Sequence, residues 1–182
     1  LINTPVSKEV GTINAIDVDY GNNFYYTVGV YIDKYSSSGA KLWYRGLSNS
    51  VSDLHVDDKS NVYVSYGSSI MKLDSNNNSL WSWTAPDTVD KIALDNNYFV
   101  YCVDNSMNVS KINSSGTTVW KTSIKSNTGT AICVDDKYNV YVGDGSTNIY
   151  VLNSQGTVTS SFVLGKGISL EGYANSMVVD DY

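Results

Sequence analysis

Residues 132–142 read Ile-Cys-Val-Asp-Asp-Lys-Tyr-Asn-Val-Tyr-Val, and this stretch decides the fold because the chain repeats its pattern. An apolar segment ends in Asp, a polar turn follows, and a β-branched and aromatic segment begins. An Asp follows such an apolar segment at five equivalent positions, Asp19, Asp57, Asp95, Asp135 and Asp180. The steps between them are 38, 38, 40 and 45 residues. Repetition at such a period indicates a repeat architecture.

Each repeat goes on to two further strand-like segments. The third ends in a turn such as Asn113-Ser114-Ser115-Gly116, and the fourth carries Trp43, Trp81 or Trp120, with Ser160 in the fourth repeat. Four short strands in about 40 residues are typical of a propeller blade. The sequence therefore predicts an all-β fold, a single β-propeller region over 1–182. Four complete blades are expected at 9–47, 48–86, 87–125 and 126–165, with partial blades at 1–8 and 166–182, as an arc of a larger ring.

The pattern resembles the quinoprotein (PQQ-dehydrogenase-like) propeller repeat. The matching segments are residues 134–142 (Val-Asp-Asp-Lys-Tyr-Asn-Val-Tyr-Val) and residues 112–120 (Ile-Asn-Ser-Ser-Gly-Thr-Thr-Val-Trp). The resemblance implies a propeller in which each Trp docks between neighbouring blades. Proteins with this repeat include dehydrogenases, an outer-membrane assembly lipoprotein and surface proteins, so function has to be argued from the site. The dehydrogenases clasp PQQ with adjacent cysteines, whereas Cys102 and Cys133 lie 31 residues apart. We therefore expect no cofactor and no enzyme.

Composition excludes several classes of partner. The net charge is −6 and there is no run of Lys or Arg, which argues against nucleic-acid binding. No apolar segment approaches the roughly 20 residues of a membrane helix. Two cysteines form neither a disulfide framework nor a Cys-rich zinc site. Fifteen Tyr with many Ser and Asn suit an extracellular, cell-envelope or virion surface.

The repeated Asp allows two interpretations. In Asp17-Val18-Asp19-Tyr20-Gly21-Asn22, oxygen-bearing side chains alternate as in a calcium loop. The alternative is an Asx turn, in which the carboxylate accepts backbone N–H groups. Five equivalent positions and the lack of a Glu at calcium-loop spacing favour the turn and predict no metal.

The first strand of each repeat has one apolar and one polar face. Asp53, His55 and Lys91 fall on the polar face and are predicted to line the channel between the second and third blades. A His beside a carboxylate could serve as a general base. No nucleophile or metal set accompanies this His, so a solvated channel lining is favoured.

Alternating strands place the second–third and fourth–first loops on one face of the ring. These loops differ between repeats, unlike the turns on the opposite face, and variable loops commonly carry function. The candidate binding residues are Tyr66, Trp83, Asp104, Asn105, Asp144 and Glu171. We expect a non-catalytic binding or assembly propeller that presents this face to a protein or surface partner, as in a phage tail or cell envelope. The parent chain or another subunit would supply the missing blades. The alternatives are a carbohydrate-binding module, which stacks sugars on an exposed Tyr or Trp83, and a fragment of a PQQ-dependent oxidoreductase.

Overall fold

The computed structural model describes residues 11–163, and every regular element in that range is a β-strand. Sixteen strands form four antiparallel sheets of four, each in sequence order, which we call blades 1 to 4. Blade 1 contains β1 (Ile13–Val18), β2 (Phe24–Val28), β3 (Tyr31–Tyr35) and β4 (Lys41–Gly46). Blade 2 contains β5 (Val51–Val56), β6 (Val62–Tyr66), β7 (Ser69–Leu73) and β8 (Ser79–Thr84). Blade 3 contains β9 (Val89–Leu94), β10 (Val100–Asp104), β11 (Asn108–Ile112) and β12 (Thr118–Ser123). Blade 4 contains β13 (Gly129–Val134), β14 (Val140–Asp144), β15 (Asn148–Leu152) and β16 (Val158–Val163).

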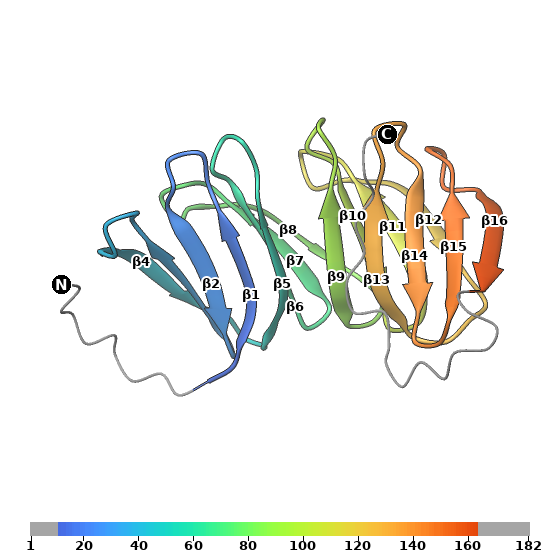
Figure 1. Ribbon diagram of the computed structural model, residues 1–182, viewed down its shortest axis with the longest axis horizontal. Coiled ribbons are helices and arrows are strands. Elements are labelled where there is room, and N and C mark those ends of the chain that lie inside the picture. Colours follow the sequence, from blue (N-terminus) through green and yellow to red (C-terminus); the bar gives the residue numbers. More distant parts are fainter. Residues whose placement is uncertain (1–10, 164–182) are drawn as a thin grey trace.

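The blades stand side by side in chain order, in a propeller-like arrangement (Figure 1). The first strands β1, β5, β9 and β13 contact one another in turn and form the inner edge. The fourth strands β4, β8, β12 and β16 form the outer edge of each sheet. Even the register repeats, because in every blade the third–fourth strand pairing shifts at the same place, as at Lys34/Tyr35 and Lys72/Leu73. No helix in residues 11–163 is long and apolar enough to cross a membrane.

The repeated Asp builds the turn after each first strand. Asp19 Oδ1 accepts the backbone N–H groups of Gly21 and Asn23, both at 2.9 Å, and Asp19 Oδ2 accepts the Tyr25 hydroxyl at 3.0 Å. The same three kinds of donor bind Asp57, Asp95 and Asp135. Burial raises the pKa of Asp19, but the bonds from Asn23 and Tyr25 outweigh it and hold the pKa below its usual value. The Asx-turn interpretation is confirmed, since protein donors already occupy the carboxylate oxygens.

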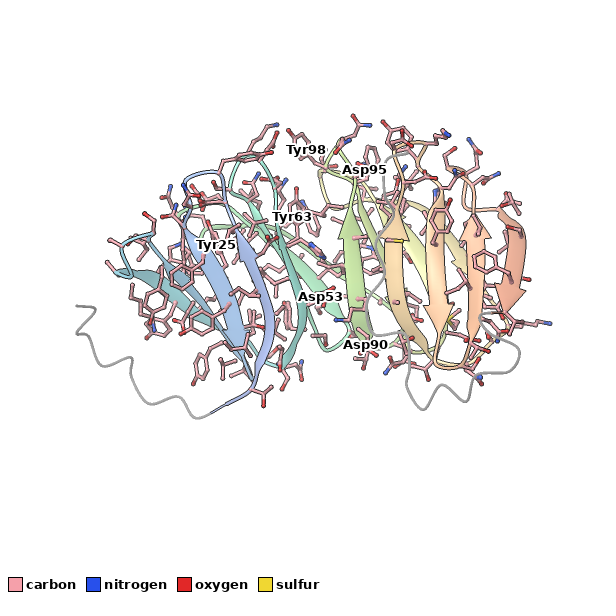
Figure 2. The ribbon with its side chains drawn as sticks, in the orientation of Figure 1. Tyr25, Asp53, Tyr63, Asp90, Asp95 and Tyr98 are labelled. Carbon is pink, nitrogen blue, oxygen red and sulfur yellow. The ribbon has the colours of Figure 1, made fainter. Side chains whose placement is uncertain are left out.

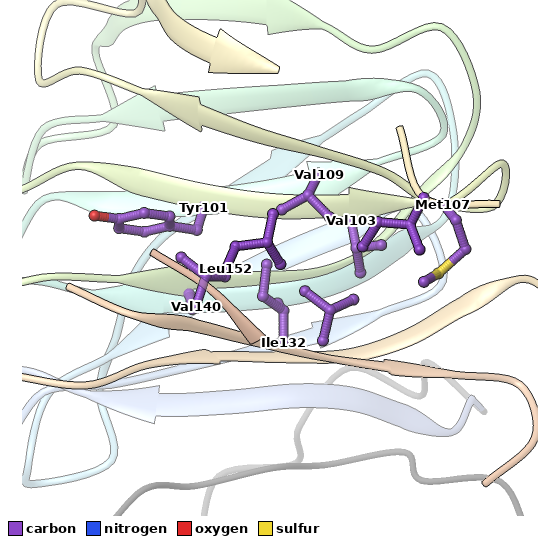
Figure 3. Close-up of a cluster of buried hydrophobic side chains, with 10 residues drawn as sticks. Tyr101, Val103, Met107, Val109, Ile132, Val140 and Leu152 are labelled. Atoms are coloured by element: carbon purple, nitrogen blue, oxygen red, sulfur yellow. The ribbon is translucent and has the colours of Figure 1, made fainter. Parts of the chain in front are cut away.

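The hydrophobic core lies between the blades, with one cluster at each of the three blade pairs. Figure 3 shows the cluster between blades 3 and 4, where Tyr101, Val103 and Met107 face Ile132 and Leu152. Alternation along each strand explains the clusters, because one face of a blade turns to the preceding blade and the other to the next.

The tryptophans join neighbouring blades at the outer edge. Trp43, Trp81 and Trp120 each donate Nε1–H at 3.0 Å to a carbonyl in the third–fourth turn of the next blade, at Ser75, Ser114 and Ser154 respectively. Each indole also meets a tyrosine of its own blade, with ring centroids 5.8–6.1 Å apart. The expected docking between blades is confirmed. All three tryptophans are half-buried.

Candidate functional site

The two ends of the blades differ in how strictly they repeat. The first–second turns, at the upper edge of Figure 1, form the turn face and share the Asp-centred geometry. The second–third and fourth–first loops form the loop face. There, blades 1 and 2 use two-residue connections that begin with Gly29 and Gly67, at φ 56° and 53°. Blades 3 and 4 use the three-residue loops 105–107 and 145–147. Structural variation is therefore concentrated on the loop face.

Asp104 and Asp144 hold these longer loops together from within. Asp104 Oδ1 accepts the backbone N–H groups of Ser106 and Asn108 at 3.1 and 2.8 Å, and Asp144 makes the same pair of bonds in blade 4. Each residue is only 1% exposed. Burial raises the pKa of Asp144, but bonds from Ser126, Asn148 and Ser146 outweigh it and bring the pKa to about 2. Asp104 and Asp144, two of the predicted binding residues, are therefore not available to a partner, because both carboxylates point inward and satisfy the loop backbone.

The other predicted binding residues do not gather into one site. Tyr66 is 9% exposed and belongs to the core between blades 1 and 2. Trp83 is half-buried, and its Nε1–H donates at 2.8 Å to Thr118 Oγ1 of blade 3, so it also links blades. The half-buried Asn105 donates its backbone N–H to the Thr88 carbonyl at 2.9 Å. Glu171 lies outside the described residues.

Exposed groups on the loop face come instead from the fourth–first loops. Ser48, Asn49 and Ser50 are exposed between blades 1 and 2, and residues 125–128 are exposed between blades 3 and 4. Except for Lys125, these side chains are small, polar and uncharged. These two loops therefore present mainly hydroxyl and amide groups, whereas the loop between blades 2 and 3 adds an exposed Pro86 and the Asp87 carboxylate.

Asp53, His55 and Lys91 do come together at the inner edge, where Figure 2 marks Asp53 between blades 2 and 3. Asp53 Oδ2 lies 3.8 Å from His55 Nε2, and Oδ1 lies 4.0 Å from Lys91 Nζ. Burial lowers the pKa of His55, but the Asp53 carboxylate and then Asp17 outweigh it, and the net pKa is raised. Asp53 also accepts backbone N–H groups from Leu54 and, in the next blade, Ile92, both at 3.1 Å. These bonds give Asp53 a structural task as a link between blades.

Two tyrosines on the turn face make contacts between blades that the sequence did not predict. Tyr98 and Tyr138 adopt φ 63° and 64°, a left-handed conformation that bulky residues seldom take. The Tyr98 hydroxyl donates to Asp58 of blade 2 at 2.9 Å, and Asn97 donates to the Tyr138 hydroxyl at 2.7 Å. Figure 2 shows Tyr98 at this upper edge. The available signal was a large aromatic residue at the turn position that holds Asn22 and Ser60 in blades 1 and 2.

Comparison with known proteins identifies a fold and no family. No family model and no curated protein sequence matches the chain. Among solved structures, one of U3-55K matches with a TM-score of 0.75 and 16% identity, over 85% of this chain and 52% of that one. The chain thus spans about half the length of this relative. At such identity the likeness shows the shared all-β fold of repeated four-stranded sheets.

Proposed function

We propose that this chain is an arc of a β-propeller that binds or assembles without catalysing a reaction, and that it presents the loop face to a protein or surface partner. The observation that carries the proposal is the contrast between the two faces. The Asp-centred turn recurs in every described blade, whereas the loops change length and chemistry between blades 2 and 3. Features common to all repeats serve packing between neighbours, and local departures serve local demands.

The chemistry of the loop face suits a protein. Exposed hydroxyl and amide groups at residues 48–50 and 126–128 can donate and accept hydrogen bonds, as the polar rim of a protein interface does. With Asp104 and Asp144 turned inward, the charged side chains that remain in the fourth–first loops are Asp87 and Lys125, which have opposite signs and so favour neither a polyanion nor a cation. The composition favours a cell-envelope, extracellular or phage-tail setting.

Two alternatives have less support. Sugar stacking needs an open aromatic face. Tyr66 is in the core and Trp83 is committed to Thr118, which leaves Tyr31, 39% exposed beside the loop of blade 1, as the aromatic residue that this alternative would use. A PQQ-dependent oxidoreductase of the resembling family would need its adjacent cysteine pair. Cys102 and Cys133 are instead two free, buried thiols on strands β10 and β13 of different blades. These residues do not fit that clasp.

A paired cross-linking experiment tests the choice of face. A photoreactive amino acid replaces exposed Asn127 on the loop face in one variant and exposed Ser114 on the turn face in a matched control. Both proteins are irradiated in an extract of the source, and cross-linked partners are identified by mass spectrometry. We expect a partner that is cross-linked from Asn127 only. A specific partner captured only from Ser114 would show that the wrong face has been chosen, and saturable binding to a glycan array would favour the carbohydrate alternative.

A further inference from the structure

One face of blade 1 is exposed where the corresponding face of every other described blade is buried. Ile16 on β1 is 64% exposed. The equivalent side chains Leu54, Ile92 and Ile132 are 2%, 2% and 6% exposed, because the preceding blade covers each of them. Val18, two residues along β1, is 60% exposed. The chain thus supplies three internal examples of what covers this position.

The third–fourth turn of blade 1 has the same conformation as the turns that pack against a tryptophan in blades 3 and 4. Gly116 and Gly156, at φ 84° and 80°, lie directly beneath Trp81 and Trp120, and a Cβ on them would come within 2.9 and 2.6 Å of the indole rings. Gly39 has the same position in blade 1 and the same conformation, φ 83°. Apart from its two chain neighbours, no described residue has an atom within 4 Å of where the Cβ of Gly39 would be. The Ser37 carbonyl stands where those of Ser75, Ser114 and Ser154 accept an indole N–H.

The sheet beside this turn forms an ordered aromatic surface. Phe24 and Tyr26 on β2 both stack on Tyr35 of β3, with ring centroids 5.3 and 5.8 Å apart. Val62 and Val64 hold the corresponding positions in blade 2 and are fully buried against blade 1. Phe24 and Tyr26 are half-buried and stack on the buried Tyr35, so their rings are held in place before any partner arrives, which lowers the entropic cost of docking.

From these observations we propose that the open face of blade 1 docks a further four-stranded blade whose outer strand carries a tryptophan, with the indole over Gly39 and its N–H donating to the Ser37 carbonyl. A second copy of the chain fits less well, because its blade 4 has Ser160 at the tryptophan position. The match to U3-55K covers 52% of that chain, so the matched fold has room for additional blades. This inference rests on the propeller arc of the proposed function and is independent of the partner of the loop face.

Thiol accessibility at position 16 tests the docking. Ile16→Cys is made in the 182-residue chain and in an extended chain in which a second copy of residues 87–125, which carries the Trp120 strand, precedes residue 9. The native Cys102 and Cys133 are buried and serve as internal references. We expect rapid labelling of the 182-residue variant and roughly 100-fold slower labelling of the extended one, as reaction then requires local opening of the blade pair. Gly39→Phe, which fills the place of the indole, and Ala in place of the added tryptophan should each restore rapid labelling.

Three results would overturn the proposal. Rapid labelling of the extended chain, with the added blade shown to be folded by circular dichroism, would mean that such a blade does not dock. Slow labelling of the 182-residue chain that speeds up on dilution would identify a second copy as the occupant. Slow labelling independent of concentration would mean that this chain already covers its own face. None of these readouts depends on a loop-face partner, so failure here leaves the cross-linking result intact.

Discussion

Replacing Trp81 with Ala should lower the free energy of unfolding by about 3 kcal/mol, within the range for loss of a packed aromatic side chain. The substitution removes the bond from Nε1–H to the Ser114 carbonyl, about 1 kcal/mol, and the edge contact with Tyr63, about 1 kcal/mol more. Lost apolar burial adds roughly 1 kcal/mol for a ring that is half-buried. Because Ser114 is exposed, water can replace the indole at its carbonyl, and no further penalty arises.

Glycine variants separate packing from backbone strain in the same experiment. Ala at Gly39 and Ala at Gly116 face the same left-handed strain, about 1 kcal/mol, because φ is 83° and 84°. Only Gly116 also presses against Trp81, so Gly116→Ala should cost clearly more than Gly39→Ala. Combining Gly116→Ala with Trp81→Ala should remove that excess, since the colliding ring is gone.

Urea unfolding followed by circular dichroism measures all of these differences. Leu80→Ala is the matched control, because Leu80 lies on the same strand, is 52% exposed and should change stability by no more than about 0.5 kcal/mol. A loss below about 1 kcal/mol for Trp81→Ala, or equal costs for the two glycine variants, would refute the argument that tryptophan docking joins the blades.

Three further predictions concern ionisable groups. Because the pKa of His55 is raised in the folded state, its charged form stabilises the fold at pH values below the unfolded-state pKa of about 6.5. This contribution disappears as pH rises through the folded-state pKa. The Tm difference between wild type and His55→Gln should therefore shrink with rising pH. Asp144, with a pKa of about 2 against an ordinary 3.8, should contribute about 2 kcal/mol that is complete above pH ~4 and lost as pH falls through about 2; Asp144→Asn should remove it, as acid unfolding would show. Burial raises the pKa of Cys102 to about 12 and that of Cys133 to about 11, so at neutral pH a disulfide reagent should modify both only after urea unfolds the chain.

The sequence was sufficient to predict the repeated contacts. The Asp of the turn recurs four times in the described blades and the docking Trp three times, each at fixed spacing, so a single chain is enough to reveal both as periodic patterns. The sequence also contained a signal for the inward orientation of Asp104 and Asp144. Asn108 and Asn148 follow them at the same four-residue spacing that separates Asp19 from Asn23. That spacing predicts another Asx turn and not a free carboxylate. Trp83 occurs in one blade, and the position of Tyr98 holds Tyr in only two of the four, so no pattern could indicate their partners in the neighbouring blades.

The loop face varies in sequence between blades, but hydrogen bonds between main-chain groups hold its backbone in place. This combination affects the entropic cost of binding a partner. At two of the three blade pairs, loop backbones of neighbouring blades bond directly, with Val51 donating to Gly29 and Val89 to Gly67. Within blade 3, Asn105 donates its backbone N–H to the Thr88 carbonyl. Gly145 donates in the same way to Thr128, beside the exposed residues 126–128. Because these bonds use main-chain groups, the side chains of Asn127 and Thr128 can change without loss of the framework that holds them, whereas the Ser126 hydroxyl donates to Asp144 and belongs to that framework. Binding then orders little backbone, so affinity depends on which side chains the loops present.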